Sequence, residues 1–293
     1  MQWREECIIL SLKAFSESSR IVTVFNKSLG KTSGLVKGMK ASIQPGDVSD
    51  VCWRGRSAER LGTLTIENIF SPFVHVFKNS AGVFAIDSAC SLCRNGMPEK
   101  APHPELFDEL KSLMLAISRR DWIVDYVFFE MKFLSEVGFG LDLSKCALTG
   151  ATEGLAYVSP KTGCAVTAEA GEKYKDKLFK LPEFLLSGCR TQNRSFSVLN
   201  GDGSGSLRRY APATRGSLDD ESQLEAQYDV ESVVFSKHIA HTMQPEAKPL
   251  TPVRLGHVFL ALKITEHFLR SYFCGINNKT LPFSRDCLVE SIL

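Results

Sequence analysis

The sequence predicts an α+β protein in which a small five-stranded β-barrel is followed by a mainly α-helical domain that carries a β-ribbon. Short runs rich in β-branched residues, separated by Gly, Pro and Ser, fill about the first 70 residues. Apolar residues then recur at helical spacing in longer segments, and one strand-like segment between two small-residue turns interrupts them. We therefore expect a barrel domain at 1–70 and a helical domain at 71–293.

The strands are expected at 6–13, 20–26, 31–37, 47–54 and 61–69. The last run alternates, with Leu64 and Ile66 on one face and Thr63, Thr65 and Glu67 on the other, which is typical of a half-buried strand. Five strands in about 70 residues fit an OB-fold barrel, which removes exposed edges by closure. An SH3-like barrel or an open meander is the alternative.

Three longer segments have the apolar period of helices, at 102–118, 122–140 and 254–275. The first has Pro104 and Glu105 near its start, and both residue types favour a helix N-terminus. Their apolar faces are wide enough to pack on one another. Residues 190–249 are rich in Gly, Ser, Asn and charge, which is typical of a flexible insertion.

The composition limits the partners and the compartment. The chain has 293 residues, of which 44% are hydrophobic, and a net charge of +2, so any nucleic-acid surface must be local. No apolar run reaches the 18 or so residues of a membrane span, and acidic Glu5 and Glu6 lie where a signal peptide would be positive. Nine cysteines without regular spacing indicate reduced thiols. We expect a cytoplasmic, nucleoid-associated protein without membrane contact.

No catalytic or cofactor motif is complete. Cys90 and Cys93 have redox-pair spacing, but they lie towards the end of an apolar helical stretch, so ordinary buried thiols are expected. The run "LGKTSG" resembles a phosphate-binding loop, yet Phe25 stands where that loop needs its first glycine. The six histidines form no catalytic triad or zinc-protease pattern. We expect a protein that is not an enzyme and has no cofactor.

Residues 145–171 look like a zinc ribbon that has lost its ligands. A structural zinc site needs four converging ligands, usually two C-x-x-C knuckles. Cys146 could begin the first knuckle, but the second position of that knuckle is Thr149. The second knuckle would use positions such as Thr167 and Ala170, so no metal is expected.

Basic residues are concentrated in the expected barrel. Between residues 13 and 60 there are nine basic and four acidic side chains, an excess of five positive charges. On a small barrel such residues can form a groove that follows a phosphate backbone, with aromatic side chains that stack on bases. Of the aromatic residues in this region, Phe15 is a stacking candidate, Phe25 is expected in the core, and Trp53 could have either role. The candidate DNA-binding residues are Lys13, Arg20, Lys27, Lys31, Lys37, Lys40, Trp53, Arg54, Arg56 and Arg60.

Nearly the whole chain resembles the RecO family of bacterial recombinational repair proteins. The resemblance depends on "CIILSLKAFSESSRIVTVFNKSLGKTSGLVKGMK", "FLSEVGFGLDLSKC" followed by "YVSPKTG", "KLFKLPEFL" and "ITEHFLRSYF". It implies an N-terminal OB-fold, a helical second domain and, in many members, a four-cysteine zinc ribbon. Family ligands would map to Cys146, Thr149, Thr167 and Ala170, and this chain lacks three of the four cysteines.

The resemblance also implies a non-catalytic DNA-binding mediator. Such a protein binds single- and double-stranded DNA, anneals complementary strands, binds the C-terminal tail of the single-strand-binding protein SSB, and works with RecR to load RecA. For the SSB tail we expect an apolar pocket with a basic rim on the helical domain. The alternative is a protein-binding adaptor of the repair machinery whose barrel makes no direct DNA contact.

Overall fold

The computed structural model describes residues 1–38, 43–57, 61–76, 79–118, 122–190, 255–276 and 278–292. Met1–Gln192 and Val253–Leu293 form one compact unit. The insertion that we expected at 190–249 lies outside the described residues, apart from residue 190. Within the described part of the chain, none of the helices is long and apolar enough to cross a membrane.

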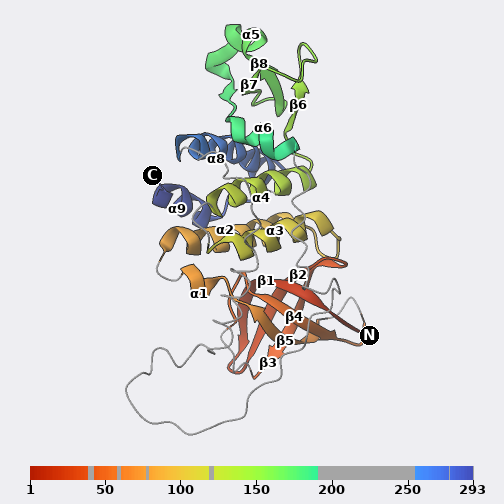
Figure 1. The fold of residues 1–293 in the computed structure, drawn as a ribbon. Coiled ribbons are helices and arrows are strands. Elements are labelled where there is room, and N and C mark those ends of the chain that lie inside the picture. The colour runs from red at the N-terminus through yellow and green to blue at the C-terminus, as the bar shows by residue number, and fades with distance from the viewer. Residues whose placement is uncertain are drawn as a thin grey trace, which may run out of the picture. The chain divides into compact units, whose positions relative to one another are not determined.

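Five strands at the N-terminus close into a barrel with the order β1-β2-β3-β5-β4, as Figure 1 shows. β3 and β5 pair in parallel at one short contact, and the other neighbours pair antiparallel. This closed order confirms the predicted OB-type barrel, with a longer first strand than we expected. The strands are β1 (Gln2–Ser16), β2 (Ser19–Asn26), β3 (Gly30–Lys37), β4 (Val48–Arg54) and β5 (Gly62–Phe70).

The barrel interior contains the side chains that the period-two pattern turns inward. Leu64 is buried while Thr63 and Thr65 are exposed, as the alternation in β5 predicts. Trp53 is also buried, and its ring stacks parallel to that of Trp3 with 6.3 Å between centroids. The interior cluster is Cys7, Ile9, Val22, Val24, Val36, Ile43, Val51, Trp53 and Leu64.

One side of the barrel is covered by helices. The middle of β1, residues 7–10, is buried on both faces because one face lines the barrel and the other packs on the helical core. Ile8, Leu10 and Phe25 belong to that helical core, and the ring of Phe25 contacts Phe107 edge-on at 5.9 Å. Phe25 is therefore a core residue, as predicted.

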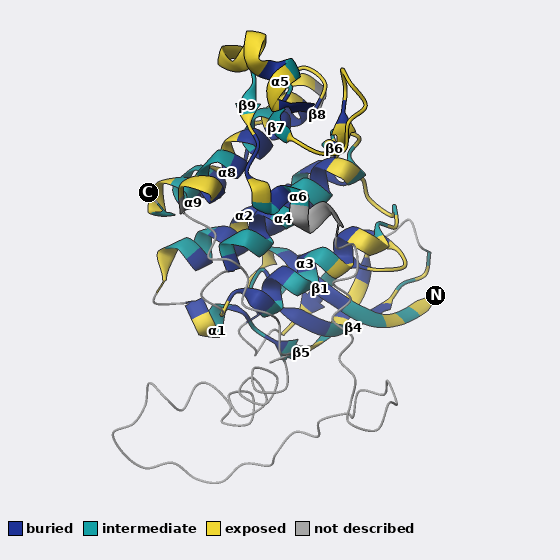
Figure 2. Cartoon of the chain, turned by 45° about the horizontal axis from the view of Figure 1, so that its top comes forward, coloured by how far each residue is buried: buried dark blue, intermediate teal, exposed yellow. Residues whose placement is uncertain are grey.

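The helical part buries a second, larger core. In Figure 2 the buried residues lie along α2, α3, α4 and β1, whereas α5 is largely exposed. The helix over 104–116 begins at Pro104 with Glu105 in its first turn, as predicted. The helices are α1 (Phe73–Val76), α2 (Ser80–Gly96), α3 (Pro104–Ala116), α4 (Trp122–Glu136), α5 (Ala168–Gly171), α6 (Glu183–Arg190), α8 (Leu255–Arg270) and α9 (Phe283–Ile292), with a 3-10 turn η1 (Glu172–Lys177) and a π-helical turn η2 (Ser271–Ile276).

A buried ion pair joins α9 to α4 and α8. Arg285 and Glu130 are fully buried, with 2.7 Å between Arg285 Nε and Glu130 Oε1. Arg285 Nη2 also donates to the carbonyl of Leu262 at 2.9 Å, and the hydroxyl of Thr265 donates to Glu130 Oε2. Burial alone would lower the pKa of Arg285, but the Glu130 charge raises it, so the guanidinium stays charged.

The ribbon is a four-stranded sheet with the order β6-β8-β7-β9. Its loop over 159–163 is held to α8, because His267 Nε2 lies 3.0 Å from the carbonyl oxygen of Pro160. The strands are β6 (Asp142–Cys146), β7 (Leu155–Val158), β8 (Cys164–Thr167) and β9 (Phe179–Lys180). A small β-ribbon is therefore present in the segment where the sequence indicated one, and it extends from Asp142 to Lys180.

Candidate nucleic-acid interface

The ten candidate residues divide into three groups. Lys40 and Arg60 lie outside the described residues. Lys27, Lys31 and Trp53 are engaged in contacts within the protein. The other five are exposed on the barrel: Lys13, Arg20, Lys37, Arg54 and Arg56.

Lys31 is a structural residue, which corrects its place among the DNA-binding candidates. It is only 9% exposed, and its Nζ donates to the carbonyl oxygens of Arg94 and Met97, both at 2.6 Å. These carbonyls lie at the C-terminal end of α2, where backbone acceptors lack helical partners and a positive charge is favourable. The ammonium of Lys31 therefore caps α2 and is not presented to a ligand.

Trp53 needs the same kind of correction, and Lys27 is paired within the protein while it remains half-exposed. Lys27 is half-exposed, but its ammonium pairs with Asp108 of α3 at 2.7 Å, so it lies at the junction between barrel and helices. Trp53 lies in the barrel core, where a Cβ at Gly62 would approach its indole to within 2.3 Å. A ring packed this closely cannot stack on a base.

Strand register places three of the exposed basic residues on the outer surface of the barrel. Lys13 pairs with Ile21, Ile21 with Leu35, Leu35 with Thr63, and Thr63 with Arg54. Opposite residues on paired strands point to the same side of a sheet, so Lys13 and Arg54 both point out of the barrel. This row runs from β1 through β2, β3 and β5 to β4, and therefore most of the way round the barrel, because β4 also pairs directly with β1.

Lys37 lies on the same outer face, because it follows Leu35 by two positions on β3. We call Lys13, Lys37 and Arg54 the basic row. Arg20 does not belong to it, since it pairs with Val36, whose side chain is in the barrel core. Arg20 is nevertheless exposed, at the start of β2.

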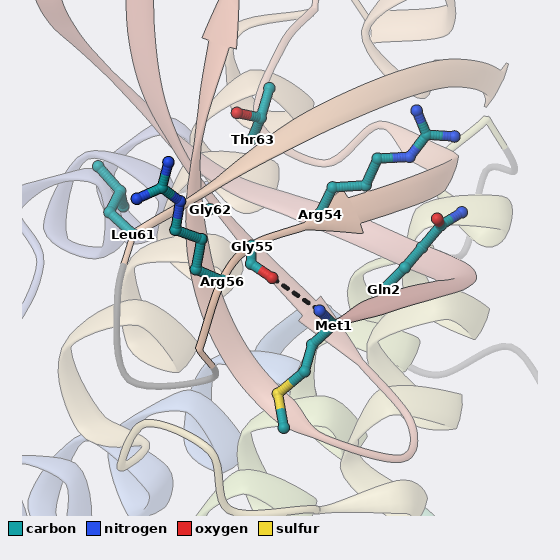
Figure 3. Close-up of a pocket in the computed structure, with 8 residues that line it drawn as sticks. All are labelled: Met1, Gln2, Arg54, Gly55, Arg56, Leu61, Gly62 and Thr63. Carbon is teal, nitrogen blue, oxygen red and sulfur yellow. Dashed lines mark hydrogen bonds between the residues drawn. The ribbon is translucent and has the colours of Figure 1, made fainter.

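Arg54 also lines a pocket together with Arg56, shown in Figure 3. The pocket has a volume of about 670 Å³ and lies where β4 ends and β5 begins. Figure 3 shows Arg54 on the side of Gln2, and Arg56 on the side of Leu61. Sequence reasoning missed Gln2 and Thr63, although the period of two places Thr63 on the outer face. The lining residues are Met1, Gln2, Arg54, Gly55, Arg56, Leu61, Gly62 and Thr63.

The positive charge of this surface is not cancelled by nearby carboxylates. Among the described residues, no carboxylate lies within ion-pair distance of any of the five exposed basic side chains. Asp50 and Glu67, which are carried by β4 and β5, both pair with Arg4 at 2.8 and 2.9 Å. The basic row and the pocket therefore keep their net positive charge.

The ribbon positions that would hold zinc converge, but their chemistry does not fit the metal. The backbone amide of Thr167 donates to the sulfur of Cys146 at 3.4 Å, and the amide of Ala170 donates to the Thr167 hydroxyl at 3.4 Å. One thiol, two hydroxyls and a methyl group cannot supply four zinc ligands. In the described part of the chain, no group of three or more His, Cys, Asp or Glu residues could hold a metal ion.

The sulfur of Cys146, at the position of a family zinc ligand, is held in a hydrogen-bond network. Burial alone would raise the pKa of this thiol, but hydrogen bonds from the side chain of Thr149 and from the backbone at Thr167, Thr149 and Leu148 lower it to about 6. Hydrogen bonds to the sulfur favour the charged form of this thiol, and the amide of Thr167 supplies one of them.

Cys90 and Cys93 are buried free thiols on α2, as predicted. The Cys90 thiol donates to the carbonyl of Ile9 at 3.6 Å, and burial raises the pKa of both thiols. A thiol of this kind is a poor nucleophile. The pair serves the contact between α2 and β1.

The fold and the site define a class: proteins in which an OB-type barrel with a basic outer face is joined to a helical domain that carries a ribbon. Two family models match the chain, "Recombination protein O N terminal" at residues 1–73 and "Recombination protein O C terminal" at residues 82–203. The chain therefore belongs to the RecO family, as its motifs indicated.

Curated relatives carry the name "DNA repair protein RecO". The protein of Cereibacter sphaeroides is 38% identical over 191 residues, which is 64% of this chain and 80% of the relative. The protein of Rhodospirillum centenum is 38% identical over 64% of this chain and 77% of its own length. That of Beijerinckia indica is 38% identical over 66% and 79%. These matches support a role in DNA repair.

Proposed function

We propose that the chain is a non-catalytic recombination mediator whose barrel binds DNA through the basic row. One observation carries this proposal: Lys13, Lys37 and Arg54 all point out of the barrel and have no carboxylate partner within the described residues. In OB-folds the face of strands 2 and 3, with the loops after strands 1 and 4, is the usual surface for oligonucleotides. The row crosses that face, and Arg56 lies in the second of those loops.

The charges of the row can hold either form of DNA. Each phosphate that a Lys or Arg neutralises releases condensed counterions, and this gain does not depend on base sequence. Two complementary strands held by the same kind of contact repel one another less, which favours annealing. We propose that this activity, together with RecR, helps to load RecA onto strands coated with SSB at the nucleoid.

A groove in the helical part is our proposed site for the acidic tail of SSB. The groove has a volume of about 530 Å³ and lies beside α2 and the start of α9. Val83, Phe84 and the 79% exposed Phe283 give it an apolar lining, and its charged lining residues are Arg94 and Asp87. The apolar lining and the cation of Arg94 support this proposal. Replacing Arg94 by Glu should weaken binding of an acidic tail peptide, and unchanged affinity would exclude the groove.

The DNA proposal is tested by the salt dependence of binding. Each lost contact should reduce the slope of log affinity against log salt by about 0.7 for single strands and about 0.9 for duplex. Changing Lys13, Lys37 and Arg54 together to Ala should therefore reduce the single-strand slope by about 2. Fluorescence anisotropy with a labelled oligonucleotide at several salt concentrations measures this change.

The matched control removes the same charge from the ribbon region. Lys145, Lys161 and Lys173 are exposed, and their triple Ala variant should bind DNA with the wild-type slope. If the salt slope of DNA binding falls in both triple variants, the net charge of the protein, and not the basic row, determines that slope. An unchanged slope in the barrel variant would favour the adaptor alternative, in which the barrel makes no DNA contact.

A further inference from the structure

Phe15 is a large aromatic side chain left in solvent at the end of β1. It is 62% exposed, whereas Phe25 and Trp53 are buried. The β1–β2 register shifts between Ala14 and Ser16, so Phe15 is the extra residue of a β-bulge. Bulges re-aim side chains and are common at barrel rims and beside binding sites.

The surroundings of Phe15 are basic. Lys13 lies two residues before it on the same strand, and Arg20 pairs with Ala14, the residue next to it. Lys37 pairs with Ser19, which also pairs with Ser16. The ring therefore lies at the loop between strands 1 and 2, with the outward-pointing Lys13 and Lys37, exposed Arg20 at the start of β2 and one acidic residue, Glu17, in the turn. In an OB-fold this loop borders the oligonucleotide surface.

We propose that Phe15 stacks on an unpaired base and makes the barrel surface selective for single-stranded DNA. This inference rests on the proposed DNA-binding function and names the form of DNA that the surface prefers. In a duplex the faces of the bases are covered by their neighbours, so a protein ring at the surface meets only the sugar-phosphate chain. In a single strand the face of a base is free, and the cations beside Phe15 hold the adjoining phosphates.

The charge around the ring favours a nucleic-acid occupant over a protein one. An apolar protein surface would gain from covering Phe15, but it would also have to desolvate Lys13, Arg20 and Lys37. A single strand satisfies both features, because it supplies an aromatic face and a phosphate at each step. Stacking of this kind does not depend on base identity, so little sequence preference follows.

Two substitutions of Phe15 distinguish the effect of its aromatic ring on binding from the effect of its apolar surface area. Phe15→Leu keeps a large apolar side chain but has no π-face, and Phe15→Tyr keeps the ring. Base stacking on an aromatic residue corresponds to roughly a 5- to 100-fold change in affinity. Phe15→Leu should weaken single-strand binding by that factor, change duplex binding less than twofold, and leave both salt slopes unchanged, while Phe15→Tyr should bind as wild type.

A probe in the DNA makes the readout specific. A single strand containing 2-aminopurine loses fluorescence when the probe stacks, so wild type and Phe15→Tyr should change its signal on binding and Phe15→Leu should not. Tyr174→Leu, at another exposed aromatic residue, is the control and should leave single-strand affinity unchanged.

Three results would overturn the inference: no loss of single-strand affinity in Phe15→Leu, equal losses for single strands and duplex, or loss of a protein partner's binding without loss of DNA binding. These results differ from failure of the proposed function. If Phe15→Leu binds normally while the Lys13/Lys37/Arg54 variant loses its salt slope, only the stacking role is wrong. If wild type shows no salt-dependent DNA affinity, the proposed function fails as well.

Discussion

Replacing Lys31 by Met tests the assignment of this lysine to the fold. Methionine keeps most of the apolar stem and removes the ammonium that donates to the carbonyls of Arg94 and Met97. Both acceptors would then lie at the end of α2 without a donor from this side chain. We expect the substitution to destabilise the contact between barrel and α2 and to leave DNA binding intact.

The expected cost follows from the two hydrogen bonds. Hydrogen bonds to a charged group contribute about 1.5–3 kcal/mol each, or roughly 3–6 kcal/mol for the pair. Desolvation of the buried ammonium opposes this gain, and burial lowers the pKa of Lys31 for the same reason. We therefore expect a net loss of about 2 kcal/mol, which for a unit of this size lowers Tm by roughly 4–8 °C.

Thermal and urea unfolding measure the loss, and Lys37→Met is the matched control. Lys37 is exposed at the end of β3, so its substitution should change Tm by little and the single-strand salt slope by about 0.7. Lys31→Met should show the opposite pattern. If Lys31→Met keeps its Tm but flattens the salt slope, the ammonium contacts DNA and our assignment of Lys31 is wrong.

Three further predictions concern the fold. Arg285→Met leaves the carboxylate of Glu130 buried without its charged partner and should reduce the free energy of unfolding in urea by about 3–5 kcal/mol, whereas the double variant with Glu130→Leu should recover part of the loss. Burial would raise the pKa of Cys146, but hydrogen bonds bring it to about 6, below its ordinary value of 9.0. Between these values the unfolded state binds more protons, so urea unfolding should show stability rising from pH 6 to pH 9 by at most about 1.4 kcal/mol per unit, and Cys146→Ala should remove that rise. Gly62→Ala places a Cβ against the indole of Trp53 and should lower Tm and shift tryptophan fluorescence, while unchanged values would contradict the described packing.

The sequence predicted the architecture well because its main elements have strong local patterns. The alternation of Leu64 with Thr63 and Thr65 marks a half-buried strand, and β5 has that form. The same rule also places Trp53 inside, since it follows buried Val51 by two positions and precedes exposed Arg54. Its basic neighbours, Arg54 and Arg56, leave the role of Trp53 open in the sequence unless the register is given more weight.

The basic residues were harder to assign, because the sequence does not show which side of a barrel is covered. Lys27 and Lys31 flank the β2–β3 turn, and only the packing of α2 and α3 reveals that this turn faces the helices. Lys13 and Arg54 lie in one row of paired residues, with three residues between them. This row exists only because β3 pairs with β5. Such non-local register cannot be read from composition or spacing.

The number of cations that remain exposed on the barrel limits how tightly the barrel can bind DNA. Two of the candidate cations lie at the junction with the helices, and the basic row by itself, without Arg20 and Arg56, offers three phosphate contacts to the proposed DNA ligand. Three contacts to a single strand correspond to a salt slope of about 2, so affinity should fall only roughly 20-fold between 50 and 200 mM salt. Proteins with six to ten contacts lose about 10³–10⁵-fold over the same range. Under the proposed function, a surface of this size would release its strand quickly, as a mediator needs if another protein is to replace it on the DNA.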